Sequence, residues 1–141
     1  MRHFTRFEAG PTSNWSKWEY LHPAFSRPTR GKLFLRARVG LTGMEVSLNS
    51  LRPEAAVPFL HTHREHEELY VFLSGSGEFV VDGERFPVEP GSVVKVDPAG
   101  RRSWRNTGSE PLTYVVIQAK ADSVTCDTIA DGVVVKDAAP W

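Results

Sequence analysis

Cysteine, excess charge and long apolar runs are all scarce in this sequence. Its 141 residues include one cysteine, Cys126, which excludes an internal disulfide and is interpreted as a small, semi-buried apolar residue. Seventeen basic and seventeen acidic side chains leave no net charge, which argues against nucleic acid as a partner. The apolar runs have the length of strands, and residues 1–7 lack the apolar core of an export signal. We therefore expect a cytoplasmic protein that does not enter a membrane.

Turn residues, in contrast, recur at short intervals between runs of strand length. Asp82-Gly83 lies between two such runs and is typical of a tight β-hairpin. Met44, Val46 and Leu48 alternate with polar residues, the pattern of a half-buried strand. Many short antiparallel strands predict one all-β domain, a closed or double-sheet barrel. The predicted strands are residues 32–39, 44–51, 57–63, 69–74, 78–81, 84–88, 92–96, 102–106 and 112–119.

The two ends of the chain differ from this pattern. Residues 1–31 carry aromatic side chains among prolines and polar residues without a clear period. We interpret them as an irregular N-terminal arm that packs on the barrel, residues 32–126, or on a second subunit of a homodimer. Residues 127–141 form a C-terminal tail, in which residues 132–136 could add an edge strand.

The most informative segment contains three of the five histidines. His61 and His63 are two residues apart, so an extended chain directs both imidazoles to the same side. Glu68 follows five residues later, far enough for the chain to turn and present a carboxylate to them. Two imidazoles and one carboxylate suit a divalent transition metal with positions left open for substrate or water. The alternative is a solvated, charge-rich loop.

This segment resembles the first motif of the cupin superfamily, specifically the small single-domain cupins with a conserved barrel. That motif is glycine, five residues, His-x-His, three or four residues, glutamate, six residues and glycine. His61, His63, Glu68 and Gly75 match it, whereas Ala55 replaces the first glycine. The resemblance covers roughly residues 40–119. It implies a double-stranded β-helix (jelly-roll) barrel with the site in its mouth.

The second cupin motif is incomplete. Gly91, Gly100 and Asn106 match its pattern, but no histidine follows His66. Counting from Gly91 or Asn106 assigns the family's fourth ligand position to Arg102, whereas counting from Gly100 assigns it to Ser103. An arginine cannot bind a metal and would favour an anionic ligand through its fixed charge. A serine would leave a site with three ligands.

Three arrangements of the site therefore stay open. His61, His63 and Glu68 bind iron, zinc, nickel or manganese as a triad in the first. In the second the metal site is degenerate, and the histidines and arginine bind a carboxylate, a sugar or a phosphate. In the third His66 substitutes as a ligand, although its position in a presumed turn makes a solvated loop histidine the simpler interpretation.

Strand parity extends the pocket beyond these ligands. If Glu68 points inward, so do Tyr70 and Phe72, and if Arg102 points inward, so does Trp104. These four residues are predicted to bind a small-molecule substrate, although plain barrel core is an equal alternative for the aromatic ones. The resemblance implies a metal-dependent isomerase, dioxygenase or decarboxylase. The alternatives are a non-catalytic binding module for a small anion or carbohydrate, or a structural or storage role.

Overall fold

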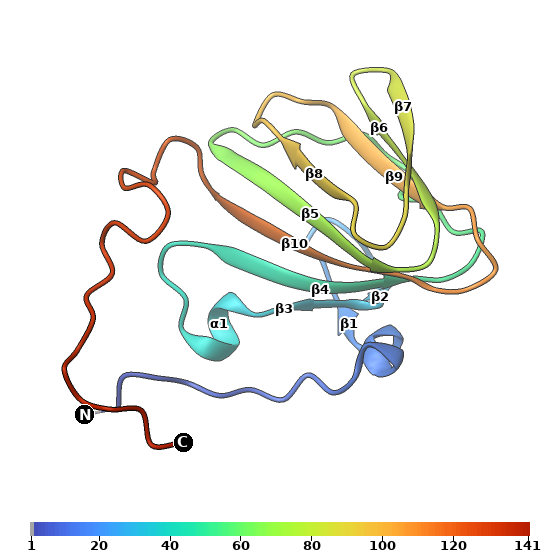
Figure 1. Cartoon of the computed structure of the whole chain (residues 1–141). Coiled ribbons are helices and arrows are strands. Elements are labelled where there is room, and N and C mark those ends of the chain that lie inside the picture. The colour runs from blue at the N-terminus through green and yellow to red at the C-terminus, as the bar shows by residue number, and fades with distance from the viewer. Residues whose placement is uncertain (1) are drawn as a thin grey trace.

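The structure, a computed structural model that describes residues 2–141, is an all-β barrel of two antiparallel sheets (Figure 1). The prediction of a jelly-roll barrel is confirmed. The larger sheet contains β3 (Lys32–Phe34), β4 (Glu45–Leu51), β10 (Leu112–Lys120), β5 (His66–Ser74) and β8 (Val93–Val96), in this spatial order. The smaller sheet contains β7 (Glu84–Val88), β6 (Gly77–Val81) and β9 (Arg102–Asn106).

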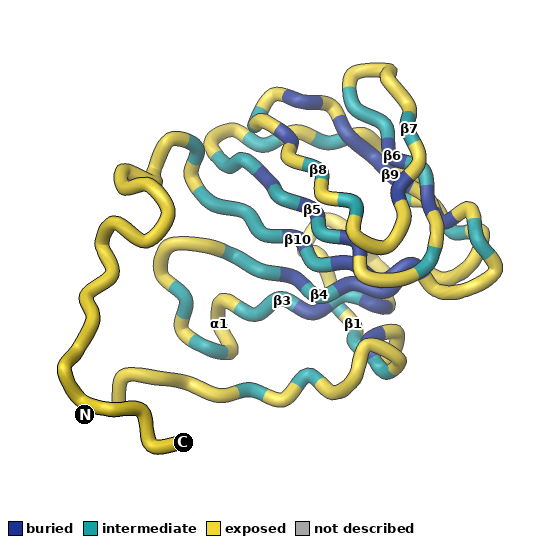
Figure 2. Tube along the Cα trace, in the orientation of Figure 1, coloured by how far each residue is buried: buried dark blue, intermediate teal, exposed yellow. Residues whose placement is uncertain are grey.

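An aromatic core fills the space between the two sheets. Buried and partly buried residues alternate from Glu68 to Phe72 in β5 and from Tyr114 to Ile117 in β10, and the buried ones face the smaller sheet (Figure 2). Aromatic rings pack edge to face across the gap, and the Tyr70 and Trp104 ring centroids are 5.0 Å apart. The core residues are Tyr70, Phe72, Phe79, Val88, Val96, Trp104, Leu112, Tyr114 and Val116.

In the middle of β4 the polar residues are buried and the apolar residues are partly exposed, which is the reverse of what their hydropathy predicts. Ser47 and Asn49 are 3% and 2% exposed, whereas Val46 and Leu48 are only partly buried. Asn49 pairs with Tyr114 of the core, which fixes the polar set on the inner face. Val46 and Leu48 therefore lie on the outer face of the sheet and not in the barrel core. The reason is that Trp15 and Leu33 cover the outer face, where Leu33 pairs with Leu48.

Two predicted strands are corrected by the structure. The strand expected over residues 32–39 ends at Phe34, and α1 (Arg36–Val39) follows because the chain turns back at Gly40, whose φ is 74°. Residues 57–63 form no strand within the described chain. They run beside β9 with isolated bridges instead, which leaves their side chains free to turn toward the barrel mouth.

The N-terminal arm packs partly on its own barrel. It contains η1 (Thr12–Lys17), β1 (Glu19–Tyr20) and β2 (Thr29–Arg30). Trp15 is 7% exposed and donates from Nε1 to the carbonyl of Gly10, while the Gly31 amide donates to Trp18. These contacts hold η1 against β4.

The C-terminal tail extends away from the barrel (Figure 1). Residues 132–136 form no strand, and Cys126 is exposed, so both of these expectations are wrong. Val133 and Val134 are 87% and 95% exposed, because this segment finds no apolar surface on its own chain to cover it. Across residues 2–141, η1 and α1 contain six and four residues, and neither has the length or apolarity of a bilayer-crossing helix.

Gly75 and Gly83 offer a test of the barrel's turns. Both have positive φ, 86° and 89°, but a Cβ at Gly75 would lie 2.5 Å from the Pro111 carbonyl oxygen, whereas a Cβ at Gly83 meets nothing within 4 Å. Gly83→Ala should lower the free energy of unfolding by about 1–2 kcal/mol through backbone strain alone. Gly75→Ala should lower it further, because backbone must also move. Urea unfolding measures both losses, and equal losses would contradict the close packing at Gly75.

Candidate functional site

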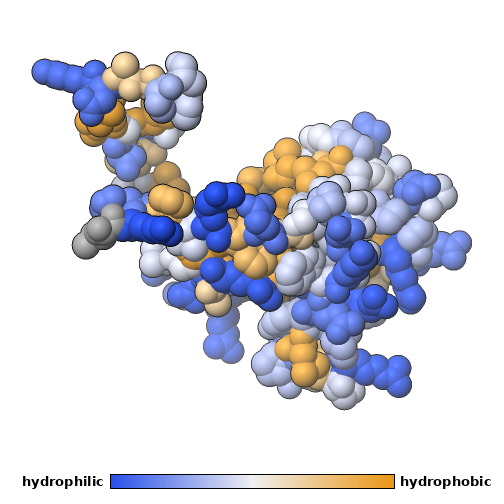
Figure 3. All heavy atoms as spheres, turned by 90° about the horizontal axis from the view of Figure 1, so that it is seen from below, coloured by the Kyte–Doolittle hydropathy of each residue, from blue (hydrophilic) through white to orange (hydrophobic). Residues whose placement is uncertain are grey.

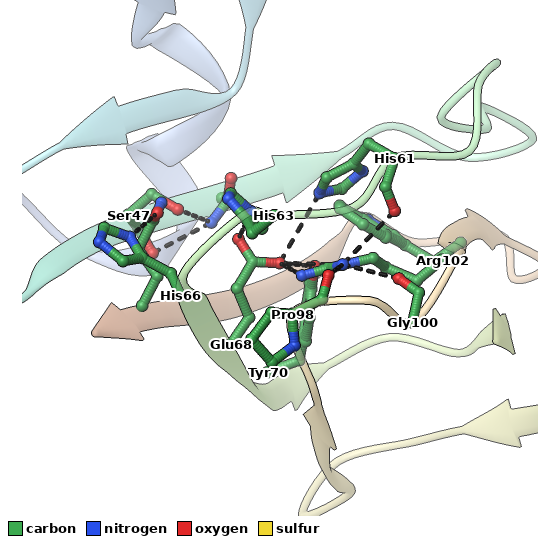
Figure 4. Close-up of polar contacts among 12 residues, drawn as sticks. Ser47, His61, His63, His66, Glu68, Tyr70, Pro98, Gly100 and Arg102 are labelled. Atoms are coloured by element: carbon green, nitrogen blue, oxygen red, sulfur yellow. Dashed lines mark hydrogen bonds and ion pairs between the residues drawn. The ribbon is translucent and has the colours of Figure 1, made fainter. Parts of the chain in front are cut away.

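The segment that carries His61 and His63 is held beside β9 by backbone hydrogen bonds. His61 and Arg102 exchange two such bonds, each of 3.2 Å. The His63 amide donates to the Pro98 carbonyl at 2.8 Å. The segment is therefore anchored at both histidines, and their imidazoles project over the mouth of the barrel (Figure 4).

Glu68 meets both imidazoles from the neighbouring strand β5. Its Oε1 lies 2.8 Å from His63 Nε2, and its Oε2 lies 3.7 Å from His61 Nε2. One ligand atom from each of the three residues lies within 4.8 Å of the others. Glu68 is 4% exposed, whereas both histidines are partly exposed. The three side chains form a compact donor set whose imidazole side faces the open mouth.

Arg102 occupies the position opposite these donors, beneath the carboxylate. Its side chain is fully buried, and Nη2 and Nε lie 3.1 and 3.3 Å from Glu68 Oε2. Its Nη1 donates to the Gly100 carbonyl at 2.7 Å. The Ser103 hydroxyl instead donates to the Val57 carbonyl at 2.8 Å, away from the site. Of the two candidates for the fourth ligand position, Arg102 is the one that faces the donors.

The two oxygens of Glu68 have different surroundings. Oε2 accepts hydrogen bonds from Arg102 and from the Tyr70 hydroxyl, whereas Oε1 contacts only His63 within the described chain. Burial by itself would raise the pKa of Glu68, but hydrogen bonds from His61, His63 and Tyr70 outweigh it and hold this pKa well below its usual range. The carboxylate is thus ionised and fixed in orientation, with Oε1 directed at the imidazoles.

Tyr70 stays protonated beside this carboxylate. Burial, followed by the charge of Glu68, raises the pKa of its hydroxyl far above the usual value. Its ring packs against Phe79 and Trp104. Tyr70 is therefore a permanent donor to Glu68 and an element of the core.

The other residues predicted to bind substrate lie at different depths. The Trp104 ring centroid is 6.1 Å from that of His61, and its Nε1 donates to the Tyr114 hydroxyl at 2.8 Å. Phe72 is 1% exposed and packs between core rings. Contact of Phe72, Tyr70, Arg102 or Trp104 with a substrate stays a prediction.

His66 is not the loop histidine expected from the sequence. It begins β5, its Nδ1 donates to Gln118 Oε1 at 2.9 Å, and its ring stacks on that of His63 with centroids 6.2 Å apart. The bond to Gln118 engages one ring nitrogen, and the ligand atoms that converge are those of His61, His63 and Glu68. His66 therefore borders the donor set rather than completing it.

The inner wall of β3 and β4 is polar, which hydropathy alone does not predict. Lys32 Nζ donates to Asn49 Oδ1 at 2.9 Å, and Asn49 Nδ2 donates to Ser47 Oγ at 2.9 Å. A signal existed in the polar residues at alternate positions of β4. Hydropathy alone assigns such residues to solvent, so it predicts the wrong face of the sheet for them.

The donors present fit a divalent transition metal. Imidazole nitrogen and carboxylate oxygen are its usual protein ligands, and three such ligands leave further positions open. One polar atom of these donors, His61 Nδ1, is buried without a hydrogen-bond partner in the described chain. Arg102 orients Glu68 through Oε2, while Oε1 is directed at His63.

Comparison with known proteins agrees with this architecture. Residues 48–118 match the family model described as a cupin domain. The crystal structure of a cupin protein from Bacteroides fragilis is 30% identical, has a TM-score of 0.78, and aligns over 96% of this chain and 99% of that one.

Two curated relatives match shorter regions. Glucose-6-phosphate isomerase of Pyrococcus horikoshii is 34% identical over 76 residues, which are 50% of this chain and 40% of the isomerase. The oxalate-binding protein of Thermotoga maritima is 33% identical over 58 residues, which are 41% of this chain and 48% of that protein. The matched regions thus span less than half the length of either relative.

The buried pair of Arg102 and Glu68 predicts a large stability difference between two neighbouring arginines. Arg102→Met should lower the free energy of unfolding by about 3–5 kcal/mol, because it leaves a buried carboxylate without its cation. The matched control is Arg101→Met, whose side chain is exposed and should change stability by less than about 0.5 kcal/mol. Guanidinium unfolding of both variants measures the difference. Similar small losses would mean that the pair contributes little to the fold.

Proposed function

The chain belongs to the cupin domain family, and on that premise we propose that its barrel mouth binds a divalent transition metal together with a small anionic ligand. The observation that carries this proposal is the convergence of His61, His63 and Glu68, whose ligand atoms lie within 4.8 Å of one another. Iron, zinc, nickel and manganese all accept this donor set. A bound metal would act as a Lewis acid on an oxygen atom of the ligand.

The charges around the donors favour an anionic ligand. Arg102 balances Glu68, and the ammonium of Lys32 lies on the inner wall. With neutral imidazoles, these three side chains sum to one positive charge before any metal is added. A carboxylate or phosphate group would offset the positive charge of the metal and of Lys32.

Isomerisation is the reaction class that a relative supports. The matching Pyrococcus protein is a glucose-6-phosphate isomerase, 34% identical over 76 residues. We propose a metal-dependent isomerase acting on a small anion. In this role Arg102 and Tyr70 keep Glu68 ionised and oriented, and the partly exposed imidazoles face the ligand.

A second candidate is binding of a small organic anion without metal or turnover. The observation that favours it is the ion pair between Arg102 and Glu68. The guanidinium neutralises the carboxylate charge that would otherwise attract a cation. The matching Thermotoga protein is named an oxalate-binding protein. The two candidates differ in one measurable property, the metal content of the protein.

We expect metal-free protein to take up about one equivalent of a divalent metal, measured by elemental analysis after dialysis against zinc, manganese, nickel or ferrous iron. His61→Ala should abolish stoichiometric binding and lower affinity by more than about a hundredfold, since loss of an outer partner alone costs ten- to hundredfold. His66→Ala is the matched control and should retain the metal.

Two outcomes would change the assignment. If His66→Ala loses the metal as His61→Ala does, His66 is a ligand. If the wild type takes up no metal but melts at a higher temperature with oxalate, anion binding replaces the metal-dependent function.

We also propose that the protein forms a homodimer through its C-terminal tail. The support is the exposure of apolar side chains on a segment that projects from the barrel (Figure 3). These side chains are Ile129, Val133, Val134, Val135 and Trp141, between 70% and 101% exposed. Apolar residues gathered on one projecting segment are typical of an interaction surface.

Charge on the tail should separate the dimer without unfolding the barrel. Val134→Asp should convert the dimer to monomer in sedimentation velocity while leaving the melting of the dilute protein unchanged, since this side chain is 95% exposed. Val124→Asp, 82% exposed but outside residues 127–141, is the control and should stay dimeric. A wild type that sediments as a monomer at all concentrations would refute the proposal.

A further inference from the structure

The inner wall formed by β3 and β4 is unexpectedly polar for the interior of a barrel. Lys32 pairs with Asn49, which pairs with Tyr114, which pairs with Phe72, so all four side chains share the inner face of the sheet. Half of this row is aromatic core and the other half is polar. Burying polar groups is unfavourable unless they are hydrogen-bonded, so the polar half requires a reason.

Asn49 fixes the ammonium of Lys32 in place. Asn49 is 2% exposed, and its amide nitrogen donates to the Ser47 carbonyl at 3.0 Å and to Ser47 Oγ at 2.9 Å. These bonds direct Oδ1 at Lys32 Nζ, 2.9 Å away. The amide of Asn49 therefore has a settled orientation, and Lys32 is held rather than free to reach bulk solvent.

The ammonium of Lys32 has unused hydrogen-bonding capacity. It carries three N–H donors, and the bond to Asn49 is the one hydrogen bond it makes to residues 2–141. No ion pair involves Lys32 in this part of the chain. Burial lowers its pKa to about 8, an effect that the charges of Glu68 and Glu45 partly oppose, so the ammonium form still predominates at pH 7.

An open hollow lies beside neighbours of both Lys32 and the donor set, although neither Lys32 nor the three donors lines it. Nζ lies 5.0 Å from the centre of the Phe34 ring, and Phe34 lines an open hollow of about 940 Å³ at the end of the barrel. Gln118 and His66 line the same hollow, and His66 stacks on His63. A small molecule in this hollow would contact Phe34 and His66, which are neighbours of Lys32 and His63.

We propose that Lys32, held by Asn49, binds an oxyanion of the ligand, a carboxylate or a phosphate, while the rest of the ligand extends toward His61, His63 and Glu68. This inference rests on the proposed binding of a small anion in the mouth and names the residue that recognises the negative charge. Arg102 is excluded from that role, because it is fully buried and paired with Glu68. Lys32 faces the inner side of the sheet and has donors to spare, whereas Arg36 and Lys120, which line the hollow, are exposed.

The test measures binding of oxalate, glucose 6-phosphate and uncharged glucose by isothermal titration to the full chain. Lys32→Met keeps the apolar stem and removes the charge, and should weaken binding of at least one of the two anions about tenfold or more. Lys32→Arg should retain part of the affinity. Lys17→Met, in exposed η1, is the matched control and should bind as the wild type does. Glucose should bind equally weakly to all variants.

A second measurement does not depend on a variant. Acetylation of wild-type lysines by an amine-selective reagent, quantified by mass spectrometry, should slow at Lys32 when the bound anion is present and stay unchanged at Lys17. Lys32→Met should melt no lower than the wild type, because it removes a poorly hydrated charge. Should the variant fail to fold, the acetylation result decides.

The outcomes separate this inference from the proposed metal function. Equal anion affinity of Lys32→Met and wild type, or wild type that binds neither anion, overturns the role of Lys32 whatever the metal content. If anion binding depends on Lys32 in a protein that contains no metal, the role of Lys32 is supported and the proposed metal-dependent function is wrong. If oxalate alone depends on Lys32 the ligand is a carboxylate, and if glucose 6-phosphate alone does it is a phosphate.

Discussion

The ion pair between Arg102 and Glu68 is the interaction on which the site depends. It places a charged carboxylate in the barrel interior, where the fully buried guanidinium offsets the loss of water. Arg102 also bonds to the Gly100 carbonyl and, through its backbone, to His61. One side chain and its backbone therefore link the floor of the site to the segment that carries the imidazoles.

Because of this pair, the two oxygens of Glu68 have different partners. Oε2 is occupied by Arg102 and Tyr70, whereas Oε1 is directed at His63. A cation at an expected ligand position would repel a metal if it stood among the donors. Because Arg102 lies behind the carboxylate, it orients Glu68 without standing among the donors.

The barrel has two inner walls of different chemistry. Aromatic residues of β5, β6, β9 and β10 fill one side and supply the rigidity that holds Glu68 and Arg102 in place. Ser47, Asn49 and Lys32 form the other side and are hydrogen-bonded to one another. An open hollow lies at the end of the barrel, lined in part by Phe34 of β3 and His66 of β5.

The sequence by itself determined the barrel, most of its strands and the convergence of His61, His63 and Glu68, because turn residues and the His-x-His spacing are local signals. It left Arg102 and Ser103 undecided, since only the pairing of β9 with the histidine segment settles which side chain faces Glu68. It also did not predict that Lys32 and Asn49 lie on the inner face of the sheet. A strand's hydropathy tells which residues are polar, but only tertiary structure tells which face is covered, and here η1 covers the apolar face of β4 and turns the polar one inward.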